Sequence, residues 1–158
     1  MRRWVPLAAA IVLPVWLWAA NDVPAPSTCT PEVNSKLSNL LASGTKSNTD
    51  NVMVCGMTTR RSRYQPAGAH GSHHVHSVLA KFPDGSNKLV EIVTNDDLDG
   101  VVTSPAHAQM FAYGQAFFSN TQQFAAGIHD THCSTHKGAD NGWVVVNGDK
   151  HPPSCPNR

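Results

Sequence analysis

Residues 73–95, HHVHSVLAKFPDGSNKLVEIVTN, constrain the fold of this chain more than any other segment. Two runs rich in β-branched and apolar residues flank PDGSN, which is a strong turn signal, so we expect an antiparallel hairpin with strands near His74–Phe82 and Lys88–Thr94. One arm carries histidines and the other carries Glu91. Because a His and a Glu on neighbouring strands can exchange protons with a ligand, the hairpin bears on function as well as on fold.

The length of the turn decides whether Glu91 and His76 share a face of the sheet. A turn of two or four residues places Glu91 on the same side as His76. A three-residue Pro-Asp-Gly turn with a bulge reverses the parity and places Glu91 with Val75 and Ser77. The sequence leaves both registers open.

The N-terminal segment has the layout of a secretory signal peptide. Two arginines precede an apolar run that ends in small residues, MRRWVPLAAAIVLPVWLWAA, and the run is short for a membrane span. We expect residues 1–20 to be removed, residues 21–50 to form an extension and a helix, and residues 51–158 to form the main domain. A single N-terminal anchor is the alternative.

Four cysteines follow this leader, at positions 29, 55, 133 and 155. In an oxidising secretory route an even number of cysteines predicts disulfides, here two. The spacing leaves all three connectivities open. Since Cys29 and Cys155 lie near the two ends of the mature chain, at least one bridge is expected to tie a terminus to the body.

The charge balance excludes a strong electrostatic field at neutral pH. The formal net charge is +1 with the nine histidines neutral. Because imidazoles titrate between about pH 6 and 7, mild acidification would make the surface basic. We therefore expect affinity for an anion such as RNA to rise as the pH falls.

The order of the expected elements indicates an α+β fold. Pro31 at a first helical position and apolar residues at helical spacing predict one helix over Pro31–Ser43. A single early helix followed by strands suggests a helix packed on one face of an antiparallel sheet. The further strands are expected at residues 51–57, 113–119, 124–129 and 142–147.

A basic cluster lies in residues 58–74, TTRRSRYQPAGAHGSHH, a stretch without periodicity that reads as a loop. It contains Arg60, Arg61, Arg63 and Tyr64. The cluster is either a solvated loop or a nucleic-acid contact, because guanidinium groups suit phosphate oxygens and tyrosine offers a stacking face.

Polar side chains on four successive expected strands are the main sign of a catalytic site. Such residues either face solvent or build a site, because buried polar groups without partners cost free energy. A sheet face that carries imidazoles and a carboxylate suits acid–base catalysis, and RNA supplies its own nucleophile in the 2′-hydroxyl. The residues are His74, His76, Glu91, Gln115, His129 and His132.

Several segments resemble the fungal ribonuclease N1/T1 family. GQAFFSNTQQFAAGIHDTH is similar to the third and fourth strands of that family, and THKGADNGWVVV to the stretch before its last strand. VMVCG looks like its early Tyr-x-Cys motif, and KLVEIV stands where the family places its catalytic glutamate. The likeness covers about residues 52–155, and it implies a disulfide-bridged, microbial ribonuclease-like α+β fold with Cys55–Cys155 and Cys29–Cys133 as pairs.

The resemblance also implies roles for individual residues. Glu91 would be the base, His74 or His76 the partner histidine of the first strand, and a later histidine the acid. The residues that could supply this acid are His129, His132 and His136.

Two departures from the family pattern weigh against catalysis. Gln115 stands where the resemblance expects the arginine that stabilises the phosphate, and a glutamine supplies no charge. The Tyr-Pro-His motif that precedes the first catalytic histidine is absent. A domain that keeps the scaffold while losing its active site is similar to the ribonuclease-like secreted effectors of plant-pathogenic fungi.

The sequence thus predicts a secreted virulence effector, extracellular or translocated into a host, that binds RNA or a host protein with weak or lost catalysis. We expect a monomer with no cofactor, no bound metal and no membrane association after leader removal. One alternative is an active endoribonuclease that cleaves single-stranded RNA through a 2′,3′-cyclic phosphate. The other is a histidine-rich metal-binding protein, suggested by HGSHHVH and HDTHCSTH.

Overall fold

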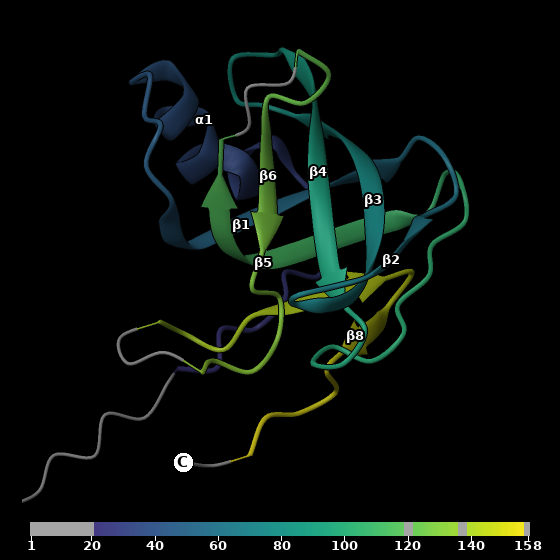
Figure 1. Ribbon diagram of the computed structural model, residues 1–158. Coiled ribbons are helices and arrows are strands. Elements are labelled where there is room, and N and C mark those ends of the chain that lie inside the picture. Colours follow the sequence, from purple (N-terminus) through teal and green to yellow (C-terminus); the bar gives the residue numbers. More distant parts are fainter. Residues whose placement is uncertain (1–20, 119–121, 136–138, 157–158) are drawn as a thin grey trace, which may run out of the picture.

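The computed structural model describes residues 21–118, 122–135 and 139–156 (Figure 1). The expected signal peptide, residues 1–20, and His136 lie outside the described residues. Across the described ranges, no helix has the length and apolar character needed to cross a membrane.

Five strands close into a β-barrel (Figure 1). Around the barrel, β1 (Thr49–Thr58) is followed by β3 (Gly71–Lys81), β4 (Asn87–Asn95), β6 (Ala126–His129) and β5 (Gln109–Phe117). The ring closes because β5 also pairs with β1. Every pairing is antiparallel except that of β4 with β6, which is parallel.

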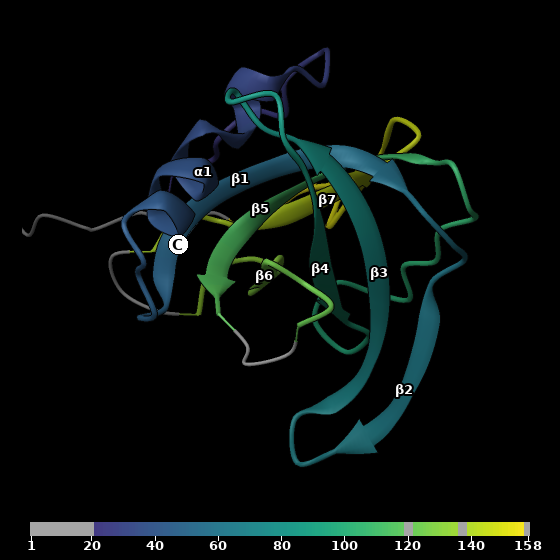
Figure 2. The same cartoon turned by 90° about the horizontal axis from the view of Figure 1, so that it is seen from above.

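Three strands extend the sheet beyond this barrel. The edge strand β2 (Arg63–Gly68) pairs with β3, and Figure 2 shows the hairpin that they form reaching away from the barrel. On another side, β7 (Trp143–Val146) pairs with β5 and continues into β8 (Asp149–His151).

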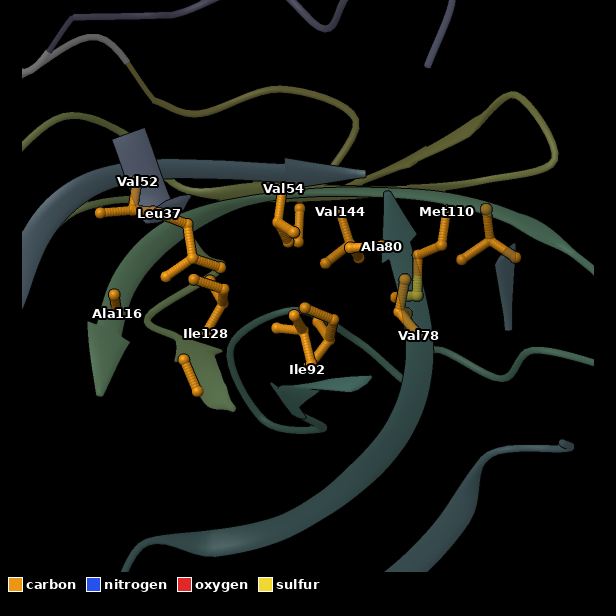
Figure 3. Close-up of a cluster of buried hydrophobic side chains, with 14 of the residues drawn as sticks. Leu37, Val52, Val54, Val78, Ala80, Ile92, Met110, Ala116, Ile128 and Val144 are labelled. Atoms are coloured by element: carbon orange, nitrogen blue, oxygen red, sulfur yellow. The ribbon is translucent and has the colours of Figure 1, made fainter. Parts of the chain in front are cut away.

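The interior of the barrel is filled by the inward-facing residues of its strands (Figure 3). Along each strand, alternate side chains point inward, as the two-residue period requires. Burying one such aliphatic side chain contributes about 1.5–3 kcal/mol, which makes this cluster the main source of stability. Its labelled members include Val52, Val54, Val78, Ile92, Met110 and Ile128.

The expected helix is confirmed as a short 3₁₀ turn, η1 (Pro31–Asn34), that continues into α1 (Ser35–Ala42). Leu37 of α1 points into the barrel beside Val52 (Figure 3). Asn34 is fully buried; its amide nitrogen donates to the carbonyls of Cys55 and Lys81, and its oxygen accepts from the Cys55 amide. These contacts attach the helix to β1 and β3.

The expected α+β fold, with a helix on one face of an antiparallel microbial ribonuclease-like sheet, is therefore wrong. The chain is mainly β-sheet closed into a barrel, with one short helix. The sequence did not reveal β2, because this strand is exposed on both faces and lacks an apolar alternation. Residues 58–74 were therefore expected to form a loop. The parallel contact of β4 with β6 joins distant segments and leaves no local signal.

Both expected disulfides form, but the pairing that the resemblance implied is wrong. The bridges are Cys29–Cys55 and Cys133–Cys155 instead of Cys55–Cys155 and Cys29–Cys133. Each one ties a terminal segment to the body, as the positions of Cys29 and Cys155 suggested. Cys29 pairs with β1 because the N-terminal segment lies over the outer side of β1, β5 and β7, where it covers Phe111 and Trp143.

The hairpin of β3 and β4 has the parity of the second register considered above, with Glu91 on the same face as Ser77. Lys81 pairs with Asn87, so the turn contains five residues, Phe82–Ser86. The Phe82 amide donates to the Ser86 carbonyl, and the Gly85 amide to the Phe82 carbonyl. Ser77 therefore lies opposite Glu91, while His76 lies opposite Ile92, a residue of the core.

His76 is accordingly buried inside the barrel. Its Nδ1 lies 2.7 Å from Oγ of Ser104, and its Nε2 lies 3.4 Å from Oγ1 of Thr94. Burial lowers the pKa of His76 to about 4, and the neighbouring His74 acts in the same direction.

This lowered pKa predicts a loss of stability in acid. The unfolded chain binds a proton at His76 near pH 6.5, whereas the folded chain binds it only near pH 4. The contribution is complete above pH 6.5 and is lost as the pH falls from about 6.5 to about 4, by roughly 3 kcal/mol in total.

Urea unfolding of the wild type and of His76→Gln at several pH values measures this contribution. We expect the difference in free energy of unfolding between the two proteins to shrink by about 2–3 kcal/mol between neutral pH and about pH 4. A difference that stays constant over this range would show that His76 does not titrate with the expected shift.

Candidate functional site

Charged and aromatic side chains from four strands share one outer face of the barrel. The register places Ser77 of β3 beside Glu91 of β4, and Glu91 beside Gly127 of β6. It also places Phe117 of β5 beside Gly127. Since directly paired residues project to the same side of a sheet, these positions lie in one row. We call the row formed by Arg60, Arg63, Ser77, Glu91, Phe117 and His129 the outer stripe.

The arginines lie at the β2 end of the outer stripe. Arg60 donates from Nε to Oγ of Ser77 at 3.0 Å, and Arg63 pairs with Val75 across β2 and β3. Burial raises the pKa of the half-buried Glu91 carboxyl, while the positive charges of Arg63 and Arg60 act in the opposite direction. Glu91 is therefore a partly desolvated carboxyl with two guanidinium groups nearby.

Phe117 occupies the middle of the outer stripe. A β-carbon on Gly127 would overlap the Phe117 ring, so the absence of a side chain at Gly127 lets this ring lie over β6. The ring also meets the imidazole of His129 edge-on, with centroids 5.2 Å apart and planes inclined by 75°. An aromatic ring held in this way is a surface on which a planar ligand can stack.

His129 ends the outer stripe and begins a chain of contacts with two further residues. Its Nδ1 lies 3.1 Å from Oδ1 of Asp130, and Nε2 of His132 lies 3.7 Å from the same oxygen. The His132 Nδ1 donates to the Cys133 carbonyl at 2.9 Å. The contact with His129 holds the pKa of Asp130 far below its ordinary value, and Asp130 in turn raises the pKa of His132.

A cavity of about 680 Å³ adjoins the outer stripe at Phe117 and His129. Asp99 lies in its wall and is almost fully buried. Burial raises the pKa of Asp99 to about 6, although its carboxylate accepts hydrogen bonds from the Asn95 amide and the Thr131 hydroxyl. The other residues that line the cavity are His70, His73, Val93, Asn95, Leu98, Asp130, His132 and Thr135.

The structure brings together only part of the expected catalytic set. Glu91 and His129 share the outer stripe, whereas His76 faces the opposite side of the sheet and does not converge with them. His74 is also turned inward, where its Nδ1 lies 2.7 Å from Asp96. His132 lines the same cavity as His129, and Asp130 lies between the two imidazoles.

Only some of the residues expected to contact nucleic acid lie on the outer stripe. Arg60 and Arg63 lie near Glu91, while the exposed Arg61 makes no hydrogen bond or ion pair within the described residues. Tyr64 lies over His74, with ring centroids 5.6 Å apart, and leaves more than half of its surface exposed. Gln115 donates to Asp50 and accepts from Asn48, so it takes part in a polar network at the surface.

Two groups of the site are not among the site residues expected from the sequence. Phe117 lies in an apolar run that reads as core, and only the strand register shows that it faces outward. Asp130 stands between two histidines in HDTH, which is a usable signal, but its left-handed backbone angle of 54° has no sequence signature.

The described residues provide no metal centre. Within the described ranges, no three His, Cys, Asp or Glu side chains are arranged so that they could hold an ion. In HGSHHVH the reason is geometric, because His74 and His76 project inward and already have partners, while His73 projects outward.

No protein family, curated protein or solved structure matches this chain.

Proposed function

We propose that the protein is a secreted binder of single-stranded RNA that holds the strand across the outer stripe. One observation carries the proposal: exposed guanidinium groups, a carboxyl, an aromatic ring and an imidazole follow one another on one outer face of the barrel, where the last three are partly exposed. Proteins that bind single strands combine cationic groups along the backbone with aromatic rings on which bases stack.

Different residues of the outer stripe suit different parts of the strand. Arg60 and Arg63 would contact phosphate oxygens, for which the planar guanidinium is well shaped. The Phe117 ring would stack a base, and the adjoining cavity gives a neighbouring nucleotide room. Gln115 stands where the resemblance expected an arginine and carries no charge. Arg60 and Arg63 provide positive charge from the β2 side instead.

The architecture favours the same ligand class by analogy of fold. Numbered along the chain, the barrel strands run in the order 1-2-3-5-4, with the third and fifth parallel. This is the strand order of oligonucleotide- and oligosaccharide-binding barrels, which bind their ligands over the second and third strands. Here those strands are β3 and β4, which carry Ser77 and Glu91 of the outer stripe.

The proposed setting is an oxidising compartment outside the cell, or a host into which the protein passes. Two disulfides and the leader-like N-terminal sequence support this setting. Asp130 raises the pKa of His132 at the cavity, so this imidazole would gain charge in mildly acidic surroundings and would strengthen binding of an anionic strand.

Binding of a fluorescent single-stranded RNA tests the proposal. Replacing Phe117 by Leu keeps an apolar side chain but removes the stacking face, and we expect affinity to fall by roughly 5- to 100-fold. Replacing Arg60 and Arg63 by Gln should weaken binding and make the dependence of log affinity on log salt less steep, by about 0.7 for each phosphate that is no longer neutralised.

Lys46→Gln is the matched control, because it removes one positive charge from an exposed loop outside the outer stripe. If Lys46→Gln and Arg60→Gln weakened binding equally, binding would depend on the overall charge of the protein and not on the outer stripe. If the protein binds no RNA but binds a host protein, the proposal is wrong and the protein-binding alternative holds.

Cleavage of the bound strand is a second function, favoured by the partly desolvated Glu91 carboxyl on the same face as His129. In this reaction a base takes the proton of the 2′-hydroxyl, and the 2′-oxygen forms a bond to phosphorus. The bond from phosphorus to the 5′-oxygen then breaks, and an acid protonates that oxygen. Glu91 and His129 would supply the two proton-transfer groups.

Incubation of the oxidised protein without residues 1–20 with single-stranded RNA, beside Glu91→Gln, tests this second function. Loss of one proton-transfer group should reduce the rate by about 10²- to 10⁴-fold, with 2′,3′-cyclic phosphate ends as the product of the wild type. Wild-type cleavage no faster than that of Glu91→Gln would exclude catalysis and leave RNA binding in place.

A further inference from the structure

The segment from His129 to His132 contains a turn at a residue with a positive φ. After β6 ends at His129, Asp130 adopts a left-handed backbone conformation with φ of 54°. This region is uncommon for residues other than glycine, although Asp and Asn enter it more readily than most. Backbone strain of this kind persists where the surroundings enforce it, and it gathers at functional sites.

Two glycines make room for this turn. A β-carbon on Gly114 would overlap the His129 carbonyl, and a β-carbon on Gly142 would overlap the Asp130 carbonyl. β5 and the residue before β7 therefore approach the turn more closely than any side chain would allow. The fold thus enforces the position of Asp130 from two sides.

In this position Asp130 lies close to two imidazoles. Oδ1 of Asp130 lies 3.1 Å from Nδ1 of His129 and 3.7 Å from Nε2 of His132. The Nδ1 of His132 donates to the Cys133 carbonyl, and its Nε2 faces Asp130. His129 differs, since its Nε2 has no hydrogen-bond partner within the described residues.

The tautomer of His129 follows from these contacts. A neutral imidazole carries one proton, and a carboxylate on Nδ1 holds the proton there. Nε2 then carries a lone pair and accepts hydrogen bonds. His129 and Phe117 both line the cavity and their rings are in contact, so this acceptor lies beside the ring on which a base would stack.

We propose that Asp130 is a positioning residue that fixes His129 in its Nδ1–H tautomer, and that His129 Nε2 accepts a hydrogen bond from the ribose 2′-hydroxyl, so that the site selects RNA over DNA. The inference rests on the proposed binding of a single strand and adds the group that reads its sugar. The 2′-hydroxyl is the feature by which a protein distinguishes the two nucleic acids.

Asp130→Gly and Asp130→Asn form a matched pair for the test, because both residues tolerate a positive φ. Asparagine keeps an oxygen that can accept from Nδ1, whereas glycine removes it. The ¹⁵N shifts of the His129 ring should show the Nδ1–H form in the wild type and in Asp130→Asn. Asp130→Gly should move towards the Nε2–H form, with His151 unchanged in all three proteins.

Affinities for a uridine oligoribonucleotide and its deoxy counterpart supply the functional readout, in a Glu91→Gln background so that the RNA stays intact. One hydrogen bond predicts a preference for RNA of roughly 2- to 12-fold in the parent and in Asp130→Asn. The preference should fall in Asp130→Gly, because the imidazole loses the contact that orients it, although an Nε2–H group can still donate to the 2′-oxygen.

The outcomes separate this inference from the proposed function. Equal binding of RNA and DNA by the parent would overturn the inference and leave single-strand binding intact, whereas no binding of either would overturn both. An unchanged tautomer or an unchanged RNA preference in Asp130→Gly would show that Asp130 does not position His129.

Discussion

The five-residue turn Phe82–Ser86 determines which side chains of the central hairpin face the core and which face solvent. Because strand side chains alternate, a shift of one residue would exchange the two faces of β4 against β3. The observed register puts Val90 and Ile92 into the core and Glu91 outside, opposite Ser77. The same register puts His76 into the core. The composition of the outer stripe depends on this turn.

Closure of the barrel assembles the rest of the site around Glu91. The parallel contact of β4 with β6 places Gly127 next to Glu91, although β5 lies between these two strands in the sequence. Pairing of β6 with β5 then adds Phe117, and the turn after β6 adds Asp130. The absence of a side chain at Gly127 allows the aromatic ring to lie over β6, in contact with the imidazole of His129. The groups that we assign to ligand binding thus come from segments that only the closed barrel brings together.

Local features of the fold could be predicted from the sequence, and nonlocal ones could not. The hairpin, the helix after Pro31 and the strands that contain Cys55, Tyr113 and Val145 follow from apolar periodicity and turn residues, and the structure contains them. The edge strand β2 has no buried face and therefore no periodicity to detect. Barrel closure and the disulfide pairing depend on which distant segments meet, which is why the helix-on-sheet expectation and the implied cysteine pairs were wrong.

The site was predictable to a similar extent. Polar residues on strands drew attention to Glu91 and His129, which share a face, and to His76, which does not. The sequence could not decide between the two registers, and that choice separates the pair from the buried histidine. Phe117 and Asp130 were not among the expected site residues, because outward orientation and a positive φ are properties of the folded chain.

Titration of the ¹⁵N-labelled protein with a short single-stranded RNA, followed by amide chemical shifts, tests the central claim most directly. We predict that the largest changes lie along the outer stripe, at Arg63, Glu91 and His129, and at the neighbouring cavity wall. The Trp143 indole, which donates to the Val23 carbonyl under the N-terminal segment, should stay unchanged. Changes centred on Trp143 and its neighbours, or no changes at saturating RNA, would contradict the assignment of the outer stripe as the binding face.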